Sequence, residues 1–258
     1  MIDGSQSTSW VLDHQDPPPM GVLAWVGLAA RDPEVAVEFY ATAFDWEVSR
    51  EADHITLRRA GTDVALVYSQ TPQARAADVT SHWSPFFFVS DAGPVLESVA
   101  RSGGRVLRGP FDVPGGRIAA IEDPAGAVFS VWTPRSPNSP LPGLTGAWWI
   151  ELSTPDAEAA RVFYGDLLGW TYDHSPGGPT RIRGPGGHIG RMHNVDAPPA
   201  WLPCLRVRDI EEARQRAKAA GAGQVGVTEE DAIGRLARIV DPQGATLSLL
   251  GPAESEHV

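Results

Sequence analysis

The chain has 258 residues, of which 42% are hydrophobic and 21% charged, a composition ordinary for a globular protein of two modest domains. Its net charge of −11 argues against nucleic acid or an anionic membrane as a partner, since either favours a basic surface. No apolar run reaches the roughly 18 residues of a membrane span, and the first twenty residues lack a signal-peptide core. The single cysteine, Cys204, allows no internal disulfide. A cytoplasmic location is therefore expected.

Residues 1–20 are predicted to form a tail that ends in three prolines, and residues 21–133 a first module. The module opens with a strand at 24–30 and a helix from Asp32-Pro33 to about Phe44, because Asp suits an N-cap and Pro the first turn. Three short strands are expected next, near 46–50, 54–59 and 63–69. A second unit repeats the order, with a strand at 83–89, a helix at 92–102 and strands near 105–108, 117–122 and 126–132.

A proline-rich linker at 134–145 precedes a second module at 146–252, and residues 253–258 form a C-terminal tail. The second module repeats the signature residues of the first. Asp32, Phe39-Tyr40, Trp46 and Asp123-Pro124 return as Asp156, Phe163-Tyr164, Trp170 and Asp241-Pro242. Four βαβββ units in this order predict an α+β protein of two tandem modules, each a mixed sheet with helices on its outer face.

These repeated signatures resemble the vicinal oxygen chelate superfamily, which includes glyoxalase I, bleomycin-resistance proteins and extradiol dioxygenases. The resemblance covers residues 22–133 and 146–252. It implies that each pair of βαβββ units curls its sheet into a cup, and that the concave side of the cup holds a metal or a small-molecule ligand. It leaves open whether the chain is a monomer or a homodimer.

The resemblance also implies where a metal would bind, because relatives place His, Gln or Glu ligands at set positions of the first, fourth, fifth and last strands. Three of these positions fall here on Trp25, Ser84 and Ser130 in the first module and on Trp149, Leu202 and Ser248 in the second. Tryptophan and leucine offer no usable lone pair, and a neutral serine is a poor metal donor. We therefore expect neither a metal nor another cofactor.

Alternation along the strands places aromatic side chains in the first cup. Trp25, Phe86, Phe88 and Trp132 face the cavity, together with Ser130. Such a surface suits stacking against a flat or conjugated small molecule. The alternative is that the rings simply fill the cup and form a second core.

The second cup is expected to be more polar. Glu151, Cys204 and Arg206 stand where the first module has Gly27, Phe86 and Phe88, and Trp149 and Ser248 face the same cavity. Glu151 is either a general base or ligand acceptor, or half of a buried ion pair with Arg206 that fixes the fold. Cys204 is interpreted as a small core or pocket residue.

Two histidines, His188 and His193, lie on or beside the fourth strand of the second module. Their spacing of five residues puts them on opposite faces of a regular strand, so at most one of them enters the cup. We assign His188 to the candidate ligand-binding residues.

Three functions remain open. The first is metal-independent binding of an aromatic or conjugated metabolite. The second is a metal-free enzyme of secondary metabolism (an isomerase, cyclase, lyase or hydroxylase-type protein) that uses Glu151 as acid or base. The third is a structural or regulatory protein with both cups filled.

Overall fold

The computed structural model describes residues 18–51, 54–113, 115–136, 148–174, 179–226, 228–231 and 233–253. Most of the expected N-terminal tail, most of the linker and nearly all of the C-terminal tail lie outside these residues. Among the described residues, no helix has the length and apolar character needed to cross a membrane.

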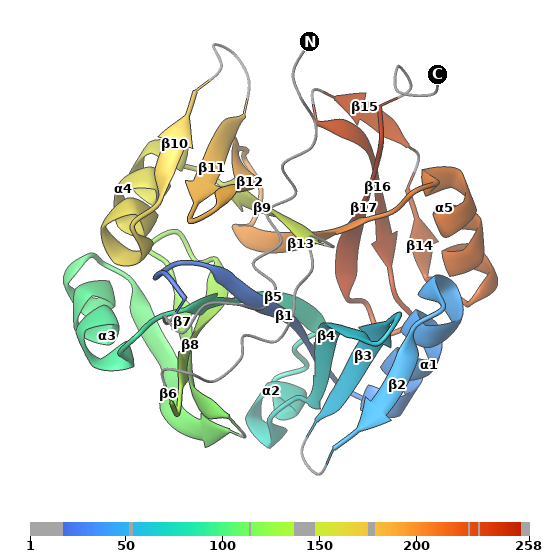
Figure 1. Ribbon diagram of the computed structural model, residues 1–258, viewed down its shortest axis with the longest axis horizontal. Coiled ribbons are helices and arrows are strands. Elements are labelled where there is room, and N and C mark those ends of the chain that lie inside the picture. Colours follow the sequence, from blue (N-terminus) through green and yellow to red (C-terminus); the bar gives the residue numbers. More distant parts are fainter. Residues whose placement is uncertain are drawn as a thin grey trace. The chain divides into compact units, whose positions relative to one another are not determined.

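The described strands form two mixed sheets, one from each half of the sequence (Figure 1). The first has eight strands in the order β2-β3-β4-β1-β5-β8-β7-β6. Their bounds are β1 Leu23–Ala30, β2 Glu47–Arg50, β3 Ile55–Arg59, β4 Thr62–Ser69, β5 His82–Phe88, β6 Arg105–Val113, β7 Gly116–Glu122 and β8 Val128–Pro134.

The second sheet has nine strands, in the order β10-β11-β12-β9-β13-β17-β16-β14, with β15 paired to β16. Their bounds are β9 Trp148–Thr154, β10 Thr171–Asp173, β11 Thr180–Gly184, β12 Gly187–Asn194, β13 Ala200–Arg206, β14 Gln224–Val225, β15 Glu229–Asp231, β16 Gly234–Val240 and β17 Thr246–Gly251. The matching strand orders confirm the predicted α+β fold of two repeated modules.

Four of the described helices begin where the sequence predicts helices, each behind an aspartate. Their bounds are α1 Pro33–Phe44, α3 Ala92–Arg101, α4 Ala157–Leu168 and α5 Ile210–Ala219. The side chains of Asp32, Asp91, Asp156 and Asp209 accept hydrogen bonds from backbone N–H groups of the first turns. This satisfies donors that a helix N-terminus leaves unpaired. A fifth helix, α2 at Pro72–Ala76, was not predicted because its five residues carry no helical apolar pattern.

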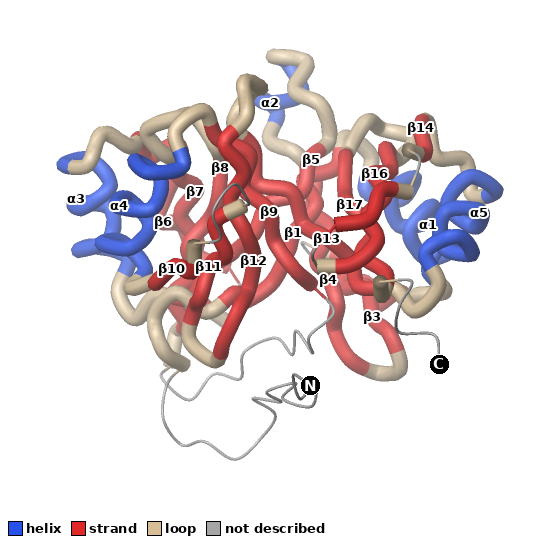
Figure 2. The backbone as a smooth tube through the Cα atoms, turned by 90° about the horizontal axis from the view of Figure 1, so that it is seen from above, coloured by secondary structure: helices blue, strands red, loops and turns tan. Residues whose placement is uncertain are grey.

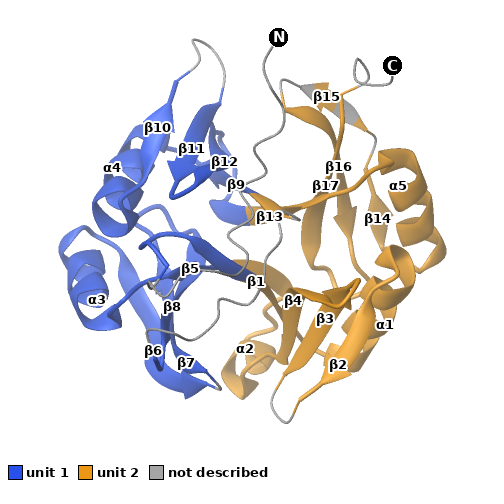
Figure 3. Ribbon diagram, viewed as in Figure 1, with its two compact units in different colours: residues 1–25, 85–146, 150–201 blue, residues 26–84, 147–149, 202–258 orange. Residues whose placement is uncertain are grey.

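The chain divides into two compact units, and each combines half of one sequence module with half of the other (Figure 3). Unit 1 comprises residues 1–25, 85–146 and 150–201. Unit 2 comprises residues 26–84, 147–149 and 202–258. Within each unit two helices lie side by side, α3 with α4 in unit 1 and α1 with α5 in unit 2 (Figure 2).

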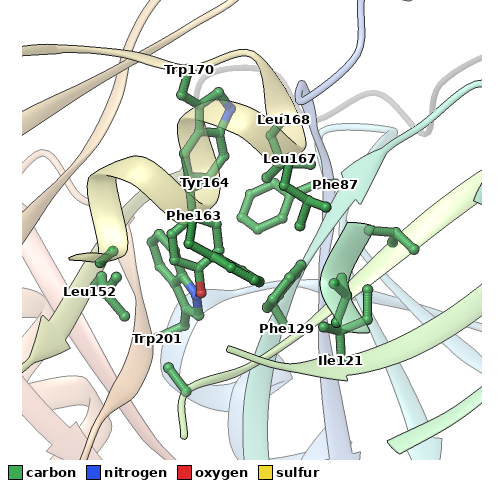
Figure 4. Close-up of a cluster of buried hydrophobic side chains, with 14 of the residues drawn as sticks. Phe87, Ile121, Phe129, Leu152, Phe163, Tyr164, Leu167, Leu168, Trp170 and Trp201 are labelled. Carbon is green, nitrogen blue, oxygen red and sulfur yellow. The ribbon is translucent and has the colours of Figure 1, made fainter. Parts of the chain in front are cut away.

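The core of unit 1 is rich in aromatic side chains that lie between its helices and strands (Figure 4). Phe163 and Tyr164 of α4 pack against Phe129 of β8, and Phe87 of β5 meets the ring of Trp170 edge-on at 4.9 Å. Rings in such edge-to-face pairs add about 0.5–1.5 kcal/mol each beyond the burial of their area. The helix side of this unit is therefore a well-packed hydrophobic core.

The repeated Tyr, Trp and Asp residues form one buried hydrogen-bond network in each unit. In unit 1, Tyr164 Oη donates to Asp123 Oδ2 at 2.9 Å and accepts from Trp201 Nε1 at 2.9 Å. In unit 2, Tyr40, Asp241 and Trp83 make the same contacts at 3.1 and 3.0 Å. Burial raises the pKa of both tyrosines, so their hydroxyls keep the protons that they donate. Each network joins one sequence module to the other, which explains why both copies retain these residues.

Candidate functional site

Each sheet has a face opposite its helices, which we call the helix-free face. On β8, Phe129 and Val131 belong to the helix-side core, so the alternating residues Ser130 and Trp132 lie on the helix-free face. Phe86 and Phe88 of β5 are the register partners of Ser130 and Trp132 and share that face. The alternation predicted from the sequence therefore places these residues together on one side of the strands.

Four rings form a continuous cluster on the helix-free face of unit 1, here called the ring cluster: Trp25, Phe86, Phe88 and Trp132. The Trp25 ring lies 5.3 Å from Phe86 and 4.9 Å from Trp132, measured between centroids, and Phe88 lies 6.2 Å from Trp132. All four side chains are buried. Gly116 leaves room for the indole, because a Cβ there would stand 2.6 Å from Trp132 Nε1.

A smaller apolar group occupies the equivalent strands of unit 2. Trp149 packs with Cys204 and Leu250, and the guanidinium of Arg206 stands 5.7 Å from the centre of the Trp149 ring, within reach of a cation–π contact. Cys204 is fully buried, and its register partner on β17 is Ser248. The structure thus brings Trp149, Cys204, Arg206 and Ser248 close together.

Glu151 is buried on β9, and its ionic partner is Arg191 on the neighbouring strand β12. Glu151 is 6% exposed and Arg191 3%, and Arg191 Nε donates to Glu151 Oε1. His193, two residues further along β12, places Nε2 at 3.6 Å from the same carboxylate oxygen, which is beyond hydrogen-bond length. Burial raises the pKa of Glu151, but His193 and Arg191 lower it by more, so that the net pKa lies below its ordinary value.

His188 lies elsewhere on the same strand and is exposed. Its Nε2 is 2.6 Å from Asp173 Oδ2, and Arg183 bonds the same carboxylate at 2.9 Å. These two contacts hold the pKa of Asp173 below its usual range. The histidine beside Glu151 is therefore His193. His188 pairs with Arg183 beyond a register shift, so the regular alternation that predicted opposite faces for the two histidines does not hold between them.

From the sequence we predicted no role for Arg191, and we placed His188, not His193, among the candidate ligand-binding residues. A signal for both residues was present, because Arg191 and His193 are separated by one residue and so share a strand face. Only the register of β12 against β9, in which Arg191 pairs with Glu151, shows that this face carries the carboxylate.

The residues at the ligand positions that metal-binding relatives use do not fit a metal. Trp25 and Trp149 occupy the first position and Ser130 and Ser248 the last, and none of these side chains is a good donor to a divalent ion. Across the part of the chain that the structure describes, no three His, Cys, Asp or Glu side chains come together in a group suited to a metal.

Comparison with known proteins identifies the family. Residues 22–131 match the model of the glyoxalase/bleomycin resistance protein/dioxygenase superfamily, and residues 149–250 match that of a glyoxalase-like domain. The chain therefore belongs to this superfamily, which confirms the resemblance to vicinal oxygen chelate proteins.

The chain is also similar to individual proteins. The anthracycline biosynthesis proteins DauV of Streptomyces sp. (strain C5) and DnrV of Streptomyces peucetius are 28% and 29% identical, each over 89% of this chain and 93% of the relative. Among solved structures, a Mn(II)-bound glyoxalase from Novosphingobium aromaticivorans has a TM-score of 0.62 at 16% identity, over 93% of this chain and 86% of that one. At that identity the likeness is one of fold alone.

The lowered pKa of Glu151 predicts an acid-dependent loss of stability. Because its folded pKa lies below the unfolded value of about 4.3, the unfolded chain binds more protons in acid. The stabilisation is complete above that unfolded value and is lost as the pH falls through the folded pKa. Urea unfolding of wild type and Glu151→Gln should therefore differ most above the unfolded pKa, and the difference should shrink as the pH falls through the folded pKa. A difference that grows towards acid pH would contradict this assignment.

Proposed function

We propose that the protein binds a small aromatic or conjugated molecule, without a metal, on the ring cluster of unit 1. The observation that carries the proposal is the cluster itself, in which Trp25 contacts both Phe86 and Trp132 on the face opposite the helix-side core. Aromatic rings recognise flat ligands by stacking and edge contacts, each contributing about 0.5–1.5 kcal/mol beyond area burial. Trp25 stands at a strand position that the resemblance assigns to a metal ligand in relatives, and Trp132 lies two residues beyond another such position, Ser130, which supports this face as the place of a ligand.

The relatives indicate the general kind of ligand. Two of them are named for anthracycline biosynthesis, and we infer that the ligand here is a fused-ring aromatic product of secondary metabolism.

Titration with anthraquinone-2-sulfonate, followed by tryptophan fluorescence and calorimetry, tests the proposal. The wild type should bind this probe equally well with and without EDTA. Trp132→Leu should weaken binding about tenfold, because it removes one stacking partner. Trp46→Leu is the matched control, since Trp46 stacks on Tyr40 in unit 2, and it should change the affinity less than twofold. Absence of binding by the wild type would overturn the proposal in favour of a filled, structural face.

A second candidate is catalysis without a metal, favoured by the buried pair of Glu151 and Arg191 with the partly exposed His193 beside it. Arg191 holds Glu151 in its ionised form, so we assign proton transfer to His193, with Glu151 as its charge partner. This role differs from the acid or base that the sequence suggested for Glu151.

Proton exchange measures this second function directly. Anthrone carries two exchangeable hydrogens on the methylene carbon of its central ring, opposite the carbonyl, and deuterium uptake at that carbon reports a general base. An enzyme should accelerate the uptake, and His193→Gln should slow it about a hundredfold while binding persists. Uptake at the uncatalysed rate in the presence of bound anthrone would exclude this second function and leave binding alone.

A further inference from the structure

Seven of the described tryptophans fall into two groups that differ in the partner of the indole N–H. Trp83, Trp148, Trp170 and Trp201 each donate to a protein oxygen: Tyr40 Oη at 3.0 Å, the Val64 carbonyl at 2.7 Å, the Gly21 carbonyl at 2.9 Å and Tyr164 Oη at 2.9 Å. None of these four belongs to the ring cluster. Their N–H groups serve to hold the fold together.

The tryptophans of the helix-free face differ from these four in lacking a hydrogen-bond acceptor for the indole N–H among the described residues. The buried Nε1 atoms of Trp25 and Trp132 have no acceptor among the described residues, although the two side chains are only 5% and 3% exposed. Trp149, the counterpart of Trp25 in the second sequence copy, shares this property within unit 2. Buried donors without a partner are rare in native proteins, and each calls for a physical explanation. Here the same feature occurs at the same position of both copies.

The orientation of the rings suggests what would accept these hydrogen bonds. The planes of Trp25 and Trp132 are inclined by 58° with centroids 4.9 Å apart, so a flat molecule cannot stack on both. A ligand that lies against one ring presents its edge to the other. An indole N–H is only a donor, so the group on that edge must be an acceptor.

We propose that the ligand of the ring cluster is a fused-ring molecule with ketone, quinone or phenolic oxygens on its edge, and that these oxygens accept hydrogen bonds from Nε1 of Trp25 or Trp132. The inference rests on the proposed binding function and adds the ligand's chemical class to it. It assigns the two tryptophans a specificity role in addition to stacking. Ligands that offer only donors, such as arylammonium ions, are disfavoured by the same pair of N–H groups.

Two probes of the same shape test this inference. Anthraquinone-2-sulfonate has two ring carbonyls, and anthracene-2-sulfonate has none. The quinone should bind the wild type about tenfold more tightly, as expected when a buried donor gains an acceptor. In ¹H–¹⁵N spectra of the nine tryptophans, the quinone should shift the indole signals of Trp25 and Trp132 downfield, while those of Trp83 and Trp201 stay in place.

An isosteric replacement isolates the N–H group from the ring. Trp132→3-benzothienylalanine keeps the bicyclic ring and lacks the N–H, so it should reduce the quinone's advantage to about threefold or less; the same replacement at Trp46 should preserve it. Equal binding of the two probes by the wild type, without indole shifts, would overturn the inference and leave the binding function intact. Failure of both probes to bind would overturn the two together.

Discussion

Glu151→Ala is expected to lower the free energy of unfolding by about 3–5 kcal/mol, because it leaves the guanidinium of Arg191 buried without its carboxylate. Removing one partner of a buried ion pair costs more than the pair itself contributes, since the remaining charge keeps its desolvation penalty. Urea unfolding at pH 7, followed by circular dichroism, measures the change.

Two further variants separate this explanation from a general sensitivity to charge removal. Glu151→Leu combined with Arg191→Met should regain most of the lost stability, because neither charge is then buried. Glu34→Ala breaks the exposed pair with Arg50 and should leave the unfolding midpoint unchanged. A double variant as unstable as Glu151→Ala would show that packing at these sites, and not the buried guanidinium's loss of its carboxylate, determines the loss.

Asp123→Ala is expected to destabilise the protein by about 3–4 kcal/mol. Its Oδ1 accepts from the backbone N–H groups of Ala125, Gly126 and Ala127 at 2.8–3.0 Å, and its Oδ2 accepts from Tyr164. The substitution leaves these donors buried or poorly satisfied, and such losses are among the largest for single residues.

The matched control for Asp123 is Asp91→Ala. Asp91 caps α3 through a single side-chain bond to Gly93 N, so its loss should cost about 1 kcal/mol. Asp241→Ala removes the equivalent network in unit 2 and should resemble Asp123→Ala. Equal effects of Asp91→Ala and Asp123→Ala in thermal or urea unfolding would contradict the role given to the buried network.

Much of the fold could be predicted because its signals are local. An aspartate at each N-cap and a two-residue alternation along the strands are properties of neighbouring residues, and they correctly placed Phe129 on the helix side and Trp132 opposite it. The division into compact units has no local signal. Tyr164 and Asp123 belong to different sequence modules, and nothing in either segment shows that they share a hydrogen bond.

The ring cluster could be predicted from the sequence, but the residues that contact Glu151 could not. The ring cluster follows from alternation within single strands. The partner of Glu151 depends on how β12 is aligned with β9, and that alignment selects Arg191 and His193. A register shift in the pairing of β11 with β12, between Ile182 and Arg183, separates His188 from the regular part of the ladder. Sequence spacing alone does not encode such an irregularity.

A crystal structure of the protein grown with anthraquinone-2-sulfonate shows whether the ring cluster binds a fused-ring ligand through its indole N–H groups. We expect the ring system of the probe in contact with Trp25 and Trp132, with a carbonyl oxygen within hydrogen-bond distance of an indole Nε1 and no metal ion at Ser130. A ring cluster that excludes the probe at saturating concentration, or a metal ion bound at these strand positions, would contradict this expectation.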